Sequence, residues 1–356
     1  MNILIDIGHP AHVHYFKNFI NIMQKKGNIF LIISRNKEIE HYLLNKYHIP
    51  FVNRGKGKKG LVGKALYLFK AIHIIFKNAV KFKPDIIMSF GSPYGAIVSK
   101  LIGKPHICFN DTEHARLSHL LTDPFTKTIL TPSCYTKDLG SKHIRFKSYM
   151  ELCYLHNNFF TPDPEIFNYL GIDHGEKYVI LRFISWNASH DLGHKGLSFE
   201  MKLNLVNLIS EHAKVFISSE NNLPKDLNKY KINIPPEKIH DALSFAALFV
   251  GEGATMASEC AMVNTPAIYI NSLTAGTLEE QEQYGLIYGF RNSRGVLEKT
   301  KELLTAPDID KKHALQNKKM LKDKIDMTAF MVWFVENYPD SIKIMKQTPD
   351  YQLQFK

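Results

Sequence analysis

Three histidines lie within six residues just after the first apolar run of the chain. That run, residues 2–7, predicts a β-strand, and loops that follow strands of an open parallel sheet are where such sheets bind ligands. Histidine changes its charge near neutral pH, so His12 is a candidate catalytic residue that takes a proton from a hydroxyl or gives one to a leaving phosphate. We expect His9 and His14 to line the same substrate cleft. A metal ion shared by the three rings, or histidines that only pack, are the alternatives.

A second titratable cluster, Asp111, Glu113 and His114, follows the predicted strand 106–110. Two acids in a cleft can have their pKa values pushed apart, which leaves one acid and one base. The sequence therefore predicts Asp111 and Glu113 as catalytic residues, with His114 in the substrate cleft. The alternative is a helix start, with Asp111 or Thr112 as the N-cap and Glu113 in the first turn.

A long polar loop follows the predicted strand 179–184 in the second half of the chain. Ser185 and Trp186 are predicted to bind a nucleotide-sugar, His190 to act in catalysis and Asp191 to line the substrate cleft. The loop has neither the P-loop nor the dinucleotide-binding fingerprint.

The segment 239–259 carries the most specific pattern, which reads helix, strand, glycine-rich turn and helix. Gly251 and Gly253 let the backbone approach a ligand closely. Ala254 and Thr255 open a helix whose free N–H groups can hold a diphosphate. Glu259 lies one turn further along the same face, where it can accept hydrogen bonds from a ribose diol.

The elements that position these residues form two α/β series. Gly8 and Pro10 predict a loop that contains the three histidines, before an amphipathic helix. Short strands rich in isoleucine then alternate with helices, which is typical of doubly wound parallel sheets. The predicted fold is α/β, with two Rossmann-like domains that face each other across a cleft holding the active site. The expected boundaries are 1–150 for the first domain, 151–176 for a linker, 177–310 for the second domain and 311–356 for a helical segment that packs back toward the first, with one helix over 309–336.

The charge and cysteine content of the chain limit the kinds of molecule that it is expected to bind. The net charge of +11 and the pI of about 9.2 favour an anionic partner, and much of the excess charge lies between Lys17 and Lys104. The basic, aromatic stretch 54–83 predicts peripheral contact with an anionic membrane. The four cysteines form no C-x-x-C pair, which argues against a disulfide framework and a structural zinc site. No nucleic-acid motif is present, and no signal segment precedes the first strand, so we expect a cytoplasmic protein that does not bind nucleic acid.

The segment 239–269 resembles the nucleotide-sugar-binding half of GT-B proteins, such as the GlcNAc transferase of peptidoglycan lipid synthesis and the non-hydrolysing UDP-GlcNAc 2-epimerases. Nearly the whole chain resembles the prokaryotic domain-of-unknown-function 354 family, over residues 6–16, 111–115, 182–197, 235–269 and 323–339. The resemblance implies that His12 lies by the donor and acceptor sites, that residues 253–255 surround the donor nucleotide and that Glu259 contacts its ribose. Glu252 departs from the pattern, because it puts an acid where a diphosphate would approach.

The resemblance implies a GT-B glycosyltransferase that uses a nucleotide-diphosphate sugar, expected to be UDP-linked, in surface-polysaccharide or glycolipid synthesis. The donor would lie on the second domain and a lipid-linked or saccharide acceptor on the first, with His12 or Asp111 as the base. No cofactor and no metal ion are expected. An epimerase or hydrolase of the UDP-GlcNAc 2-epimerase type, with Asp111, Glu113 and His190 as its acid and base groups, is the first alternative. A nucleotide-sugar-binding protein without catalysis is the second.

Overall fold

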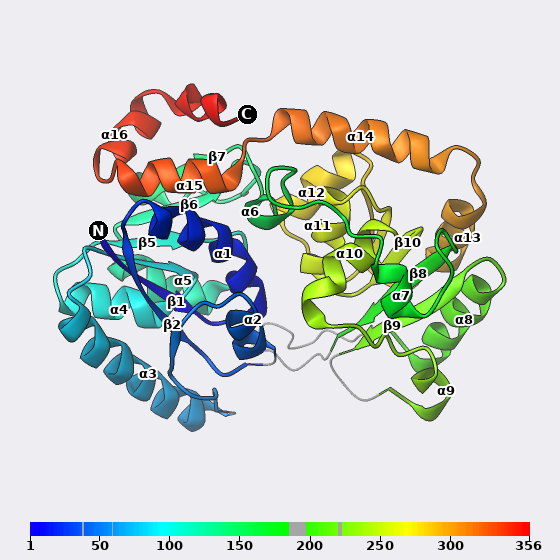
Figure 1. The fold of residues 1–356 in the computed structure, drawn as a ribbon, viewed down its shortest axis with the longest axis horizontal. Helices are drawn as coiled ribbons and strands as arrows, with labels where there is room; N and C mark the ends of the chain where they lie inside the picture. The colour runs from blue at the N-terminus through cyan, green and yellow to red at the C-terminus, as the bar shows by residue number, and fades with distance from the viewer. Residues whose placement is uncertain (38, 59, 185–196, 220–222) are drawn as a thin grey trace. The chain divides into compact units, whose positions relative to one another are not determined.

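The computed structural model describes the chain except residues 38, 59, 185–196 and 220–222, and it consists of two compact units (Figure 1). Unit 1 comprises Met1–Phe159 and Lys324–Lys356, and unit 2 comprises Phe160–Asp323. In Figure 1 each unit is a β-sheet with helices on both of its faces. The expected linker 151–176 is divided between the units, with helix α6 (Leu152–Leu155) in unit 1 and helix α7 (Ile166–Leu170) in unit 2.

The sheet of unit 1 has seven parallel strands in the order β3-β2-β1-β4-β5-β6-β7 within the described residues. The strands are β1 (Asn2–Ile7), β2 (Ile29–Ser34), β3 (Phe51–Asn53), β4 (Ile86–Phe90), β5 (His106–Phe109), β6 (Thr128–Pro132) and β7 (His143–Phe146). The order reverses between β1 and β4, so the loops after these two strands flank the crevice where doubly wound sheets bind ligands.

The helices of unit 1 form two layers. Helix α1 (Pro10–Lys25) packs with α2 (Glu40–Lys46), α6 and α15 (Met327–Glu336). Helix α3 (Leu61–Phe82) packs with α4 (Pro93–Leu101), and α4 packs with α5 (Arg116–Thr122). Right-handed crossovers require this division, because the chain winds in opposite directions from the two sides of β1. Helix α16 (Asp340–Gln347) and the 3-10 helix Pro349–Phe355 complete the unit.

The sheet of unit 2 has five parallel strands in the order β12-β11-β10-β8-β9 within the described residues. The strands are β8 (Tyr178–Phe183), β9 (Lys214–Ser219), β10 (Leu248–Gly251), β11 (Ala267–Ile270) and β12 (Ile287–Phe290). The helices longer than five residues are α8 (Phe199–Ser210), α10 (Ile239–Ser244), α11 (Ala254–Met262), α12 (Gly276–Gln283), α13 (Val296–Thr305) and α14 (Ile309–Asp323). The reversal of order lies between β8 and β10, and the glycine-rich turn follows β10.

Three predictions about the elements were wrong. Helix α1 begins at Pro10, so His12 and His14 lie on a helix and not in a loop. The helix expected over 309–336 is two helices, because the Asp326 side chain accepts a hydrogen bond from the Ala329 N–H and so starts α15 anew. Strands β7 and β12 were missed, because His143 and Arg145 interrupt the apolar pattern of β7 and Gly289 interrupts that of β12. In the described part of the chain, no helix combines the length and hydropathy required to cross a membrane.

Candidate functional site

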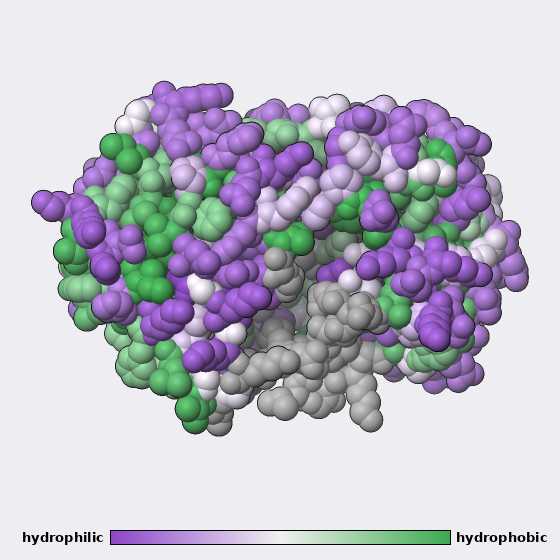
Figure 2. All heavy atoms as spheres, turned by 60° about the horizontal axis from the view of Figure 1, so that its bottom comes forward, coloured by the Kyte–Doolittle hydropathy of each residue, from purple (hydrophilic) through white to green (hydrophobic). Residues whose placement is uncertain are grey.

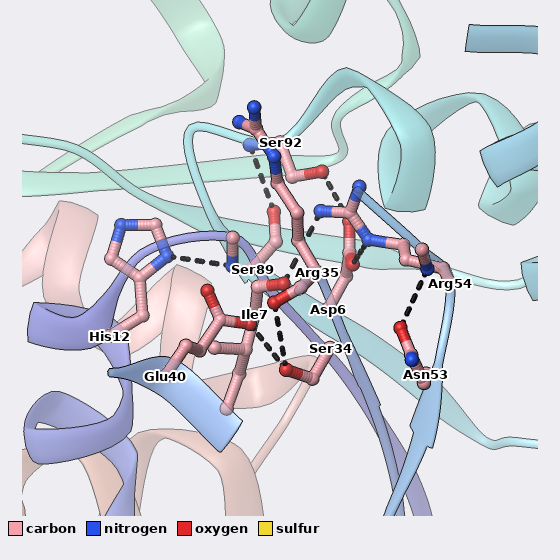
Figure 3. Close-up of polar contacts among 12 residues, drawn as sticks. Asp6, Ile7, His12, Ser34, Arg35, Glu40, Asn53, Arg54, Ser89 and Ser92 are labelled. Carbon is pink, nitrogen blue, oxygen red and sulfur yellow. Dashed lines mark hydrogen bonds and ion pairs between the residues drawn. The ribbon is translucent and has the colours of Figure 1, made fainter. Parts of the chain in front are cut away.

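His9 and His12 stand together at the carboxyl end of β1, at the start of α1. His9 is the N-cap, and its Nδ1 accepts a hydrogen bond from the Ala11 N–H at 3.2 Å. The Gly8 N–H donates to Nδ1 of His12 at 3.4 Å (Figure 3). Because Nδ1 of His12 is an acceptor, the proton of the neutral ring lies on Nε2. His12 therefore presents a hydrogen-bond donor to a ligand in this state.

The surroundings of His12 keep it uncharged. Burial lowers the pKa of His12 well below its ordinary 6.5, and the positive charges of His9, Lys37 and Arg54 lower it further. The N-terminus of α1 also disfavours a cation. His14 lies elsewhere: it is 5% exposed, and its ring packs 5.1 Å from the ring of Tyr154 on α6. The structure thus brings His9 and His12 together and places His14 in the packing of α1.

The acids after β5 have different surroundings. Asp111 is half-buried and accepts a hydrogen bond from the Thr112 hydroxyl at 2.8 Å. Burial raises the pKa of the Asp111 carboxyl to about 6, and the nearby Glu113 adds to the effect. Glu113 is 7% exposed, and its Oε1 accepts from the Thr136 N–H at 3.3 Å. His114 is half-buried beside them. Asp111 is thus ionised at pH 7 and protonated only about one unit lower, which suits a general base.

An ion pair between Asp6 and Arg54 lies beneath this edge of the sheet (Figure 3). The Arg54 Nε donates to Asp6 Oδ1 at 2.9 Å, and both side chains are at most 1% exposed. The guanidinium also donates to the Tyr67 hydroxyl at 2.6 Å and lies 4.5 Å from the ring centre of Tyr94. The Ser92 hydroxyl donates to the other Asp6 oxygen. Arg54 therefore connects β1, β3, α3 and α4. Its positive charge is balanced by Asp6 within the fold.

Glu40 is a second buried acid at the same edge. Its side chain is fully buried at the start of α2, and its Oε1 accepts a hydrogen bond from the Ser34 hydroxyl. Within the described residues its Oε2 has no hydrogen-bond partner. Burial raises the pKa of Glu40 to about 7, which Ser34 and Arg54 partly oppose. Glu40 is therefore a group that exchanges a proton near neutral pH next to His12 and Arg35 (Figure 3).

Sequence reasoning missed this set, which consists of the buried Asp6, Ser34, Glu40, Arg54, Tyr67 and Ser92 and the half-buried Tyr94. The sequence did contain a signal. Asp6 is the one charged residue in an otherwise apolar strand, and such a residue is buried only with a partner. Arg54 was counted as part of a basic surface run, but it is 1% exposed.

In unit 2 the turn after β10 leads directly into α11. Gly253 is the N-cap, and among the described residues no side chain makes a capping hydrogen bond to the helix. Gly251 is required by packing, because a Cβ there would lie 2.8 Å from the Arg182 Cβ and 2.9 Å from the Arg182 carbonyl oxygen. Ala254 is exposed and Thr255 half-buried. The first amides of α11 thus lie at the reversal point of the sheet with no side-chain cap from the described part of the chain, an arrangement that favours an anion.

Glu252 resolves the conflict that the sequence raised. Its side chain is 1% exposed, and its two carboxylate oxygens accept from the Ile184 N–H at 3.2 Å and the Leu197 N–H at 2.6 Å. These amides flank residues 185–196. The Glu252 carboxylate is therefore buried and paired with two backbone amides.

Glu259 is paired within unit 2. It is 5% exposed, and its Oε1 lies 3.1 Å from Nε2 of His240 on α10. The pair links α10 to α11 one turn behind the glycine-rich turn. A ribose diol that binds Glu259 would therefore meet a carboxylate already oriented by a histidine.

Four predicted residues, Ser185, Trp186, His190 and Asp191, lie outside the described residues. Among the residues that are described, no group of three or more His, Cys, Asp or Glu side chains could hold a metal ion.

Solved structures similar to this chain have the GT-B fold. The UDP-GlcNAc 2-epimerase of Neisseria meningitidis bound to UDP-GlcNAc matches with a TM-score of 0.68 and 13% identity, over 94% of this chain and 100% of that chain. The spinosyn rhamnosyltransferase in complex with the spinosyn aglycone matches with a TM-score of 0.59 and 12% identity, over 95% and 100%. At these identities the likeness establishes the fold and leaves the activity open.

Two sequence comparisons concern the family. An uncharacterized protein of Methanocaldococcus jannaschii is 27% identical over 281 residues, which are 75% of this chain and 81% of that protein. The model of the family described as "Protein of unknown function (DUF354)" matches residues 1–335. The chain therefore belongs to the DUF354 family and has the GT-B fold.

Proposed function

We propose that this protein is a glycosyltransferase that uses a nucleoside-diphosphate sugar. One observation carries the proposal: in a GT-B fold, a glycine-rich turn at the reversal point of the unit 2 sheet leads into a helix that no side chain caps within the described ranges. Sugar-nucleotide enzymes are among the structural neighbours, one of them bound to UDP-GlcNAc. The substrate class is the same whether the reaction is transfer or epimerisation.

The donor binds unit 2 in this proposal. Its diphosphate accepts hydrogen bonds from the first amides of α11, where the helix dipole also favours an anion. Glu259 accepts from the ribose hydroxyls, with His240 fixing its orientation at 3.1 Å. Glu252 opposes the diphosphate little, because its carboxylate is 1% exposed and both oxygens accept backbone hydrogen bonds.

Unit 1 supplies the proton chemistry. The acceptor hydroxyl attacks C1 of the sugar, the bond between C1 and the phosphate oxygen breaks, and the nucleoside diphosphate leaves with both electrons of that bond. Asp111, with a pKa raised to about 6 by burial, takes the proton of the acceptor hydroxyl. His12 acts as a neutral donor through Nε2, so the structure favours Asp111 over His12 as the base.

The acceptor is a saccharide or a lipid-linked molecule with an anionic group. The half-buried Arg35 lies at the carboxyl end of β2, and no protein group in the described residues bonds its Nε. Arg35 and Lys37 are positioned to attract a phosphate or carboxylate near His12.

An epimerase of the UDP-GlcNAc type is the second candidate. Asp111 favours it, because a carboxyl with a pKa near 6 can both take and return a proton at neutral pH. Several structural neighbours are UDP-GlcNAc 2-epimerases.

Thermal unfolding with nucleoside diphosphates and nucleotide-sugars tests the donor site. A ligand at 100 times its Kd stabilises the folded protein by about 2.7 kcal/mol. We expect one nucleotide family to raise the transition temperature of the native protein, Glu259→Gln to weaken the effect, and the surface control Glu298→Gln to leave it unchanged. The absence of any response across the panel would refute both candidates.

The transferase and the epimerase differ in whether they need an acceptor to convert the nucleotide-sugar. Each nucleotide-sugar that binds is incubated with the protein alone and analysed by proton NMR. Change at C2 of the sugar without an acceptor identifies an epimerase. A sugar-nucleotide that stays intact alone and releases nucleoside diphosphate only when a saccharide or lipid acceptor is added identifies a transferase.

A further inference from the structure

Helix α3 carries an apolar stripe on its solvent side. Val62, Leu66, Phe69, Phe76 and Val80 are 75%, 55%, 72%, 38% and 51% exposed. Their spacing of three, four or seven residues puts them on one side of the helix along about 27 Å. The opposite side carries Tyr67, Ala71, Ile75 and Ala79, which are buried against the unit. The helix thus has two apolar sides, and only one is covered by the fold.

The apolar stripe lies in a purely cationic segment. Residues 55–83, which exclude the buried Arg54, contain eight Lys residues and no Asp or Glu. Lys70, Lys77 and Lys81 follow one edge of the stripe, each exposed, and Lys83 ends the helix. In Figure 2 green hydrophobic residues gather over the part of unit 1 that α3 occupies, with purple hydrophilic residues beside them. Exposed large apolar side chains on a soluble unit mark a binding surface.

The neighbouring helices extend this surface. Leu101 at the end of α4 is 60% exposed, and Leu117 and Leu120 on α5 are 61% and 70% exposed. Helix α4 packs against both α3 and α5, so these side chains belong to the same layer of unit 1. The apolar area is therefore broader than a single helix ridge.

We propose that the exposed side of α3 docks on an anionic lipid membrane, with the apolar stripe at the level of the headgroups and acyl chains and the lysines on the lipid phosphates. An amphipathic helix with lysines beside large apolar side chains lies in the plane of such an interface. Each lysine near an anionic surface adds about 1 kcal/mol of attraction. A second copy of this chain fits less well, because a two-fold contact of this segment would bring like charges together.

The same helix leads to the candidate site. Its N-terminus follows β3, and Tyr67 on its buried side accepts a hydrogen bond from Arg54 and donates one to the Gly55 carbonyl at 3.2 Å. Docking of α3 would therefore place the carboxyl end of the unit 1 sheet near the lipid headgroups, where a lipid-linked acceptor is reached. The membrane contact itself does not depend on the proposed transfer reaction.

Vesicle flotation with the full-length protein tests the inference. We expect binding to vesicles that contain phosphatidylglycerol, little binding to pure phosphatidylcholine, and a marked loss of binding at 0.5 M salt. The double variant Leu66→Ser/Phe69→Ser should bind at least about tenfold more weakly. Lys70→Ala should weaken binding on the order of fivefold. The matched control is Leu315→Ser on α14, because Leu315 is 71% exposed in unit 2.

Three results would overturn the proposal. One is no binding of the native protein to anionic vesicles, and another is equal loss of binding in Leu66→Ser/Phe69→Ser and Leu315→Ser. The third is a native dimer by light scattering that becomes a monomer in Leu66→Ser/Phe69→Ser without vesicle binding, which would assign the surface to a second copy. The thermal unfolding experiment with nucleotides tests the donor site of unit 2 and does not depend on membrane binding. A failure of the membrane proposal can therefore be distinguished from a failure of the proposed function.

Discussion

Glu40 gives the sharpest test of the electrostatics at the carboxyl end of the unit 1 sheet. Its carboxyl is fully buried, and burial raises its pKa from 4.5 to about 7. The folded state therefore keeps a proton that the unfolded chain has lost between these two pH values. The stability that this proton contributes is fully present below pH 4.5 and is lost as the pH rises through 7.

The magnitude follows from the two pKa values. Their difference corresponds to about 3 kcal/mol in full, of which about 2 to 3 kcal/mol falls between pH 5 and pH 8. The variant Glu40→Gln keeps an oxygen to accept the Ser34 hydroxyl and cannot ionise. We expect the stability of the variant relative to the native protein to be higher at pH 8 than at pH 5 by about that amount. Any constant packing cost of the amide cancels in this comparison.

Guanidinium unfolding at the two pH values measures the effect, followed by the fluorescence of Trp333, which lies in unit 1. The chain has two tryptophans, so Trp186→Phe serves as the common background. Glu336→Gln, which removes a surface ion pair with Lys26, is the control and should show no such difference. If the stability of Glu40→Gln relative to the background is the same at pH 5 and pH 8, the argument from burial is refuted.

Three further changes test the packing and charge of the two sites by denaturant unfolding. Arg54→Met leaves the Asp6 carboxylate, which is 0% exposed, without its cation and should cost about 3–5 kcal/mol, whereas a loss below about 1 kcal/mol would contradict the assigned pair. Gly251→Ala places a methyl group 2.8 Å from the Arg182 Cβ and should cost about 1–3 kcal/mol, and an unchanged midpoint would show that the turn has room. Burial lowers the pKa of His106 to about 3, so its contribution to stability is lost as the pH falls below 6.5, and His106→Asn should flatten the loss of stability between pH 6.5 and 4. If the stability of the native protein and that of His106→Asn fall in parallel between pH 6.5 and 4, His106 does not cause the loss of stability in acid.

The regular elements could be predicted because their signals are local. The strands β1, β8 and β10 are apolar runs that end in turn residues, and the turn at Gly251 and Gly253 was expected where it lies. The first helix was placed too late, because Pro10 was taken as a turn residue although proline is also favoured at the first position of a helix. The break at Asp326 was missed because only residues 324–326 separate α14 from α15.

The roles of the charged residues could not be predicted, because they depend on contacts between distant parts of the chain. In the sequence, Glu252 places an acid where a diphosphate was expected to bind. Its hydrogen-bond partners, the amides of Ile184 and Leu197, lie 68 and 55 residues away along the chain. Arg54 pairs with Asp6 across 48 residues, so its burial could not be seen in a run of surface lysines. A charged side chain that is paired within the protein stabilises the fold, whereas one that lacks such a partner can bind a ligand.

The hydrogen-bond partners of the charged residues limit which of them can act as the proposed base. Asp6 and Arg54 satisfy each other in the buried layer, and Glu113 accepts from the backbone of Thr136. His12 stays neutral and already accepts a hydrogen bond at Nδ1, so taking up a proton at Nε2 would oppose its burial and three neighbouring positive groups. Asp111 is half-buried at the same edge, and its pKa near 6 leaves it ionised at neutral pH. For the proposed transfer reaction, Asp111 is therefore the first candidate for the base in unit 1. If the proposal is right, Asp111→Asn should abolish turnover while leaving the nucleotide-induced thermal shift intact.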